Sequence, residues 1–331
     1  RAAESISALS GEQAVLLTAK DDVLLYKDAV SRDTLFSRLT AAERIYSGAR
    51  IVVCDIEAAM QLFPAKQPFL TFSCGDECDY ASLPSVLVSM GYTREYEVEA
   101  KGGFAVRGDI IDIFPINSEN PVRIDFFGDT VEKIRPYDAV SGERLADVSS
   151  IKIVSAAETV ISADDLPAVR KALSQGLKKF PDVKAYDRAR SIADDIMAKA
   201  EGGAPFAGAS FLMPVLSSAA TLFDALSKGT TLYFDDCKLI HDKIQGLYSE
   251  HENRFNELKA GGEVFDFSLG QLVSEDALLK HISAFRGVAL QTFFGSTFFF
   301  QPLKTYTLRA TPAPSYLNVF EALLTDARNW I

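Results

Sequence analysis

The feature that most constrains the fold of this chain is a change of hydrophobic period part-way along its 331 residues. Before residue 80, apolar residues form short buried runs and stretches with helical spacing. Between Phe104 and Asp129 they instead alternate with polar residues, and Gly, Pro and Asn separate the alternating runs. Helical spacing returns after residue 158. Because a helical period does not fit a strand, the pattern predicts an α/β domain interrupted by a small antiparallel α+β domain.

The first 80 residues contain two strand–helix units. Apolar runs at 14–18 and 50–54 predict buried strands, and the spacing over 34–45 predicts a helix between them. Asp55 is expected to cap a second helix, which Pro64 stops. Strands that alternate with helices in this way favour a parallel sheet with helices on its faces.

The C-terminal half repeats this α/β pattern. Amphipathic helices are predicted at 164–178, 184–201 and 238–258, and strands at 231–234, 288–294 and 306–308. The predicted organisation is a first part of the α/β domain at 1–81, an inserted α+β domain at 82–157, a second part of the α/β domain at 158–315, and the start of a connection at 316–331. The first residue is Arg1 and the last is Ile331, so we expect a piece of a longer protein.

Charge and composition narrow the possible functions. The net charge of −11 repels phosphate, which argues against a module whose main task is to grip nucleic acid. The phenylalanine-rich run at 293–300 lacks interleaved Lys or Arg, so core or interdomain packing is favoured over base stacking. His241 and His251 are too far apart for a metal pair within one helix turn, and we expect both to be solvated.

The cysteine pattern indicates a reducing compartment. The four cysteines are scattered and predict free thiols in the cytoplasm: Cys54, Cys74, Cys78 and Cys237. No second Cys/His pair lies at zinc-site spacing, so no metal is expected. No apolar run reaches the length needed to cross a membrane, and no membrane partner is predicted.

The alternating strand at 122–127 carries the most information about function. Its apolar face holds Val122, Ile124 and Phe126, and its other face holds Arg123, Asp125 and Phe127. Arg107, in the preceding strand, is expected near this second face. An exposed arginine beside an exposed ring is typical of an interface hot spot. The periodicity alone fits a solvated sheet face with cross-strand ion pairs better, so both interpretations stay open on the pattern.

The strings GGFAVRGDIIDIFP and NPVRIDFFGDTVEKIRPYD resemble the second domain of UvrB and of the bacterial transcription-repair coupling factors. In both families this domain binds UvrA. The resemblance implies that Arg107, Arg123 and Phe127 contact UvrA, that Asp125 is a partner in the same strip, and that Arg94 is a further contact. Ser31 to Phe63 is similar to the N-terminal module of the coupling factors. The resemblance is strongest at 91–138 and extends over nearly the whole chain.

Two features distinguish the chain from UvrB, which is a helicase-like ATPase. No Gly-Lys pair exists in the sequence, so a phosphate loop is lacking. The UvrB D-E-x-H box corresponds here to Asp235-Asp236-Cys237-Lys238, which has lost both the Glu and the His. The resemblance therefore implies a degenerate, UvrB domain 1-like sheet domain without catalytic residues or cofactor. Asp235 and Asp236 are interpreted as polar residues at the end of a strand.

The function implied is a UvrA-recruiting docking module that links stalled RNA polymerase to nucleotide excision repair. RNA polymerase, DNA, ATP and Mg²⁺ are expected to be bound only by other domains of the parent translocase. The alternative is a UvrB-type excinuclease helicase subunit, an ATPase that binds DNA and whose phosphate loop lies outside this sequence.

Overall fold

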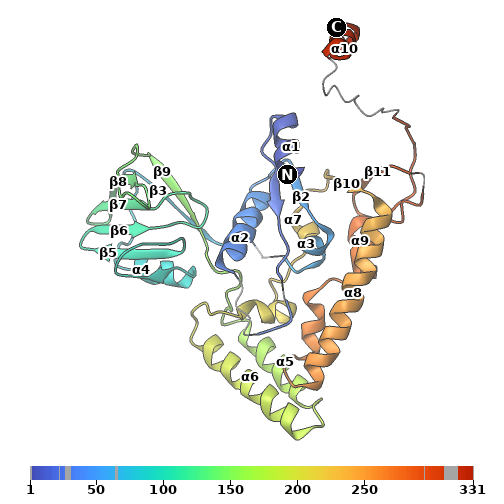
Figure 1. Ribbon diagram of the computed structural model, residues 1–331. Helices are drawn as coiled ribbons and strands as arrows, with labels where there is room; N and C mark the ends of the chain where they lie inside the picture. The colour runs from blue at the N-terminus through green and yellow to red at the C-terminus, as the bar shows by residue number, and fades with distance from the viewer. Residues whose placement is uncertain are drawn as a thin grey trace.

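The computed structural model describes residues 2–21, 23–26, 31–63, 66–293, 295–308 and 320–330. The fold is mixed α/β, with parallel and antiparallel sheets, and its buried side chains form three hydrophobic cores. Figure 1 shows the inserted antiparallel sheet projecting to one side of the remaining helices and strands. Of the helices in the described ranges, none is long and apolar enough to cross a membrane.

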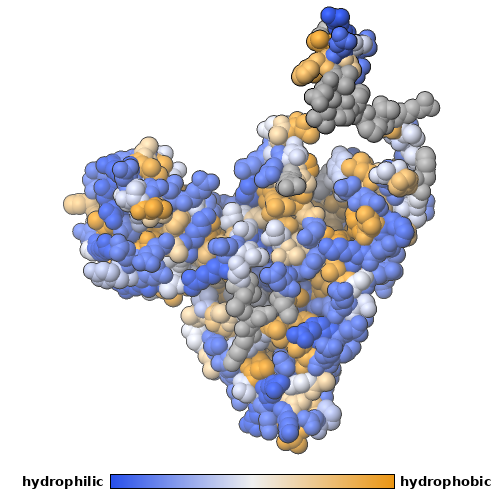
Figure 2. Space-filling model, in the orientation of Figure 1, coloured by the Kyte–Doolittle hydropathy of each residue, from blue (hydrophilic) through white to orange (hydrophobic). Residues whose placement is uncertain are grey.

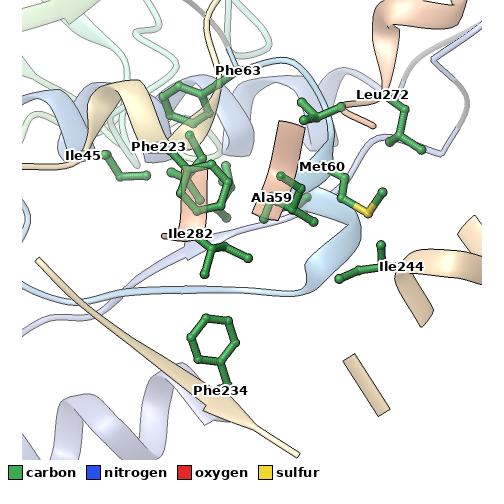
Figure 3. Close-up of a cluster of buried hydrophobic side chains, with 14 of the residues drawn as sticks. Ile45, Ala59, Met60, Phe63, Phe223, Phe234, Ile244, Leu272 and Ile282 are labelled. Carbon is green, nitrogen blue, oxygen red and sulfur yellow. The ribbon is translucent and has the colours of Figure 1, made fainter. Parts of the chain in front are cut away.

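The first core includes side chains from two parallel strand pairs, whose strands are labelled in Figure 1. One pair is β1 (Val15–Leu17) with β2 (Val52–Cys54), and the other is β10 (Thr231–Asp235) with β11 (Arg286–Leu290). The helices of this region are α1 (Ala2–Ser10), α2 (Arg32–Tyr46), α3 (Ile56–Met60), α7 (Leu222–Ala225), α8 (Cys237–Ala260) and α9 (Glu275–Ile282). Figure 3 shows Met60, Phe63 and Phe234 converging with side chains of α8 and α9.

The predicted strand–helix units in this region are confirmed, but α3 is shorter than predicted. Asp55 caps the helix as expected, and its Oδ1 accepts from the Ala58 N–H at 2.7 Å. The helix ends at Met60 because Gln61 adopts extended backbone and its side-chain amide holds the main chain of Lys20. Pro64, the predicted stop, lies outside the described residues.

Three further expectations are wrong. Residues 306–308 form no strand, because none of the described strands pairs with them and the side chains of Tyr306 and Leu308 are exposed. The strand predicted at 288–294 is present as β11, but it begins at Arg286 and ends at Leu290, and Phe294 lies outside the described residues. His251 is buried, and its Nε2 lies 3.0 Å from the carbonyl oxygen of Leu269. The helical period of α8 could not show that a later segment covers this face.

The second core fills one face of the inserted sheet. Its strands are β4 (Thr93–Arg94), β5 (Gly103–Arg107), β6 (Ile110–Ile113), β7 (Val122–Phe127) and β8 (Thr130–Pro136), in that spatial order. The helix α4 (Leu83–Ser89) packs on this core. The antiparallel pair β3 (Phe69–Ser73) and β9 (Ser150–Val154) contributes to the same core, although β3 precedes the predicted start of the insert.

The third core is helical. It is built from α5 (Leu166–Leu177), α6 (Val183–Glu201), the 3₁₀ segments η1 (Ala209–Val215) and η2 (Asp266–Gln271), and the C-terminal half of α8. Helix α8 joins two cores, because Ile244 packs in the first and Phe255 in the third. The last described element is α10 (Phe320–Trp330).

A buried ionic cluster lies where the chain leaves the insert. The Glu158 carboxylate accepts from Lys20 Nζ at 2.8 Å, and Arg38 Nε lies 3.6 Å from its other oxygen. The two terminal nitrogens of Arg38 donate to the carbonyls of Thr18 and Leu62 at 2.8 and 2.7 Å. The cluster thus ties the exit of the insert to the ends of β1 and α3.

A candidate docking surface on the inserted sheet

The polar face of the inserted sheet is organised in cross-strand rows. Side chains of directly opposed residues lie on the same face of a sheet. One row contains Ala105, Asp112, Arg123 and Arg135, and the next contains Arg107, Ile110, Asp125 and Lys133. The structure therefore brings three of the predicted residues, Arg107, Arg123 and Asp125, to one face.

The Arg123 side chain is held by a bidentate pair. Its Nε and Nη2 donate to the two oxygens of Asp112 at 2.7 and 2.8 Å, and the Tyr137 ring centroid lies 5.8 Å from its guanidinium carbon. The hydrogen bonds to Asp112 raise the pKa of Arg123 above its ordinary value. Asp112 is buried, whereas the Arg123 side chain is 39 % exposed. The pair fixes a partly exposed guanidinium to a buried anchor.

Asp125 is engaged by an arginine that the sequence pattern did not single out. Arg135 Nη2 contacts Asp125 Oδ2, whereas Asp125 Oδ1 has no hydrogen-bond partner within the described part of the chain. Arg135 lies in the row beside Asp125, on β8. Its place in the sequence, opposite Arg123 across a tight hairpin, is the signal that could have found it.

Phe127 and Arg107 are exposed residues of this face, as is Lys133. Phe127 is 81 % exposed at the end of β7, just before the turn at Gly128, whose φ is +59°. Val122, Ile124 and Phe126 are buried on the opposite face, as the alternation predicted. Arg107 Nη2 donates to the Tyr96 carbonyl at 2.9 Å. A large exposed ring on the same sheet face as exposed or partly exposed guanidinium groups is typical of a protein-binding surface.

Residues 70–158 match the family model of the UvrB interaction domain, and this range contains all five strands of the inserted sheet, β4 to β8. This segment is therefore similar to the UvrB interaction domain. The chain is 28 % identical over 288 residues to the transcription-repair-coupling factor of Bacillus subtilis, covering 82 % of the chain and 24 % of that protein. The coupling factor of Myxococcus xanthus is 27 % identical over 288 residues, covering 82 % of the chain and 23 % of that protein.

The interaction domain also relates the chain to UvrB. The UvrABC system protein B of Helicobacter hepaticus is 31 % identical over 163 residues, which cover 47 % of the chain and 25 % of that protein. The chain thus spans about a quarter of the length of these curated relatives, as the 24 % coverage of the Bacillus subtilis protein illustrates. The predicted resemblance to the UvrB-like module of the coupling factors is confirmed.

Within the inserted sheet, Arg94 lies apart from the other predicted residues. It pairs in parallel register with Phe104, whose side chain is buried in the core. The side chain of Arg94 is exposed, but its register places it toward the face opposite Arg107 and Arg123. The structure therefore groups Arg107, Arg123, Asp125 and Phe127, and leaves Arg94 outside that group.

The segment that resembles the UvrB metal box has a structural role. Asp235 ends β10, and Asp236 caps α8 by accepting from the Leu239 N–H at 3.2 Å. Lys238 donates to Asp242 one turn later at 2.7 Å. Among the described residues, no group of His, Cys, Asp or Glu could hold a metal ion.

Proposed function

We propose that this chain is the UvrA-docking module of a transcription-repair coupling factor. In this proposal the polar face of the inserted sheet binds UvrA through Arg107, Arg123, Asp125 and Phe127. The observation that carries the proposal is the position of Phe127, a ring that is 81 % exposed on the same sheet face as two arginines. The resemblance noted from the sequence assigns the contact with UvrA to these same positions.

The physical basis of the proposed binding is that Arg123 is already ordered, and Phe127 already exposed, before the partner binds. The bidentate pair with Asp112 fixes the Arg123 guanidinium, so little side-chain entropy is lost when a partner carboxylate binds it. Phe127 supplies apolar area that is already exposed and therefore gains from burial. Hydrophilic surface surrounds isolated apolar side chains on the insert, the lobe at the left of Figure 2. Such a surface suits a partner that also exists in a dissociated state.

We further propose that the α/β part is a degenerate helicase-like domain that does not hydrolyse nucleotide. The cap formed by Asp236 and the pairing of Lys238 with Asp242 support this, because in both cases a residue of the Asp235–Lys238 segment forms a hydrogen bond that stabilises helix α8. RNA polymerase, DNA and ATP would be bound by other domains of the parent protein. The link from stalled polymerase to excision repair would then pass through this surface.

A competition experiment tests the proposal. UvrB contains the same type of interaction domain, so the chain and UvrB are expected to use one site on UvrA. Labelled UvrB bound to UvrA should be displaced by the unlabelled chain, and a Phe127→Ala variant should displace it at higher concentration only. Simultaneous binding of both proteins to UvrA, or no binding of the chain, contradicts the proposal.

A further inference from the structure

Tyr96 makes two contacts with Arg107, although it lies outside the two sequence strings that carry the family resemblance. Tyr96 lies between β4 and β5, and its side chain is 91 % exposed. Its carbonyl oxygen accepts from Arg107 Nη2 at 2.9 Å, and its ring centroid lies 5.5 Å from the Arg107 guanidinium carbon. The main chain and the ring of one residue thus hold the same guanidinium.

Tyr96 and Phe127 flank one row of the sheet. The row runs from Arg107 on β5 through Ile110 on β6 to Asp125 on β7. Tyr96 contacts the first member of this row, and Phe127 follows its third member by two residues on the same strand face. Two exposed rings therefore lie at the two sides of a row that contains one guanidinium and one carboxylate.

The charged residues of this face indicate which kind of partner side chain would bind Arg107. Arg123 is paired with Asp112, and Arg135 with Asp125. Arg107 has no salt bridge to any residue that the structure describes, and only a carbonyl and a ring hold it. A guanidinium has five N–H groups, so Arg107 can donate one to the Tyr96 carbonyl and still offer two others to a planar, bidentate acceptor. The acceptor that best fits such an edge on a protein partner is a carboxylate.

We propose that Tyr96 is a further contact residue of the docking surface, and that the stacked Tyr96–Arg107 pair binds a carboxylate side chain of the partner. The inference rests on the proposed docking of UvrA. A single exposed tyrosine is ordinary on a protein surface. Tyr96 differs because it orients the one arginine of this face that lacks an internal carboxylate.

Calorimetric titration of UvrA with chain variants tests the role of the ring. Tyr96→Ala removes the ring and keeps the carbonyl, and the Kd for UvrA should rise about tenfold, as for an aromatic contact of a hot spot. Tyr96→Phe keeps the ring and should stay within about twofold of the wild type. Tyr233→Ala, which removes a ring exposed on β10 outside the insert, is the matched control and should leave the Kd unchanged.

Coupling to Arg107 tests the carboxylate. Because Tyr96 and Arg107 contribute to one contact, the Kd of a Tyr96→Ala, Arg107→Ala double variant should rise by less than the product of the fold-increases in the two single variants. The wild-type Kd should also rise more steeply with salt than that of Arg107→Ala, because an ion pair is lost. Each variant should have the same melting temperature as the wild type, because the substituted side chains are exposed.

The outcomes separate the two proposals. If the wild-type chain does not bind UvrA, the docking function itself fails. If the wild type binds UvrA and Tyr96→Ala binds equally well, the docking function stands and the role of Tyr96 is overturned. If Tyr96→Phe weakens UvrA binding as much as Tyr96→Ala, the Tyr96 ring does not act by stacking on Arg107 and the proposal is overturned. The proposal is also overturned if the effects of the Tyr96 and Arg107 substitutions on the Kd are independent.

Discussion

Asp112 and Arg123 lie opposite each other on β6 and β7 and form a bidentate ion pair, with N–O distances of 2.7 and 2.8 Å. The carboxylate is buried, and the guanidinium is partly open to solvent. A buried acidic residue on the same sheet face therefore determines where the arginine of the proposed docking surface points. Asp112 is part of the surface although it presents little of its own area.

Asp112→Asn should weaken the binding of UvrA without removing a contact. The amide keeps the size of the side chain but cannot accept both N–H groups of Arg123, so the guanidinium gains freedom. Ordering it again on binding should cost about 0.5–1.5 kcal/mol. Titration calorimetry measures the change, and circular dichroism checks the fold. An affinity equal to that of the wild type would show that the pair does not prepare Arg123 for binding.

Glu158→Gln should destabilise the protein strongly. Glu158 is the acceptor for buried Lys20, and the Arg38 guanidinium beside it is fully buried. Loss of the charge leaves these cations without a counter-ion inside the protein, which should cost about 3–5 kcal/mol of unfolding free energy. Urea denaturation measures this change.

Glu201→Gln is the control for this variant, because the Arg170–Glu201 pair is exposed. Its loss should cost less than about 1 kcal/mol. Similar losses in Glu158→Gln and Glu201→Gln would contradict a structural role for the buried cluster between the insert and the α/β part.

Asp165 should make stability depend on pH in the acidic range. Burial raises the pKa of Asp165, but hydrogen bonds from Ser162 and Ser217 outweigh this effect and hold it below its ordinary value. The lowered pKa contributes stability above the ordinary carboxylate pKa, and this contribution is lost as the pH falls through the folded-state value. Asp165→Asn should therefore flatten the loss of stability between about pH 5 and pH 2.

The measurement is the urea midpoint across this pH range for the wild type and both variants. Asp164→Asn, at the exposed neighbouring position, serves as the control. If Asp165→Asn loses stability on acidification as steeply as the wild type, the hydrogen bonds from Ser162 and Ser217 do not set the pKa.

The chain should not turn over ATP. The residues that correspond to the UvrB metal box cap α8 and form an i,i+4 pair, so they are engaged in helix structure. Phosphate release from ATP should equal the buffer blank, with and without DNA or UvrA. DNA-stimulated hydrolysis by the purified chain would support a UvrB-type helicase subunit instead.

The sequence was most informative where one face of an element is buried. In β7 the alternation correctly separated Val122, Ile124 and Phe126 from Arg123, Asp125 and Phe127, because a strand with one buried face has a period of two. The pattern could not show which residues hold the arginines. Asp112 pairs with Arg123, Arg135 with Asp125, and Tyr96 with Arg107 through strand order and loop path, which are tertiary properties.

The incorrect predictions outside the insert also arise from tertiary contacts that the sequence pattern does not show. Helix α3 ends early because the side chain of Gln61 binds a distant main chain, and His251 is buried because η2 covers α8. The run at 306–308 has strand-like composition, but within the described part of the chain no strand pairs with it to form a hydrogen-bond ladder. Of the phenylalanine run at 293–300, Phe299 packs in the first core as predicted, whereas Phe293 is exposed.

The most direct test of the docking surface is a calorimetric titration of UvrA with the Phe127→Ala variant, beside the wild type and Tyr233→Ala. Both rings are exposed, but only Phe127 lies on the inserted sheet. Phe127→Ala should lose about 1–4 kcal/mol of binding free energy while Tyr233→Ala loses none. Wild-type affinity in a correctly folded Phe127→Ala variant would contradict the account.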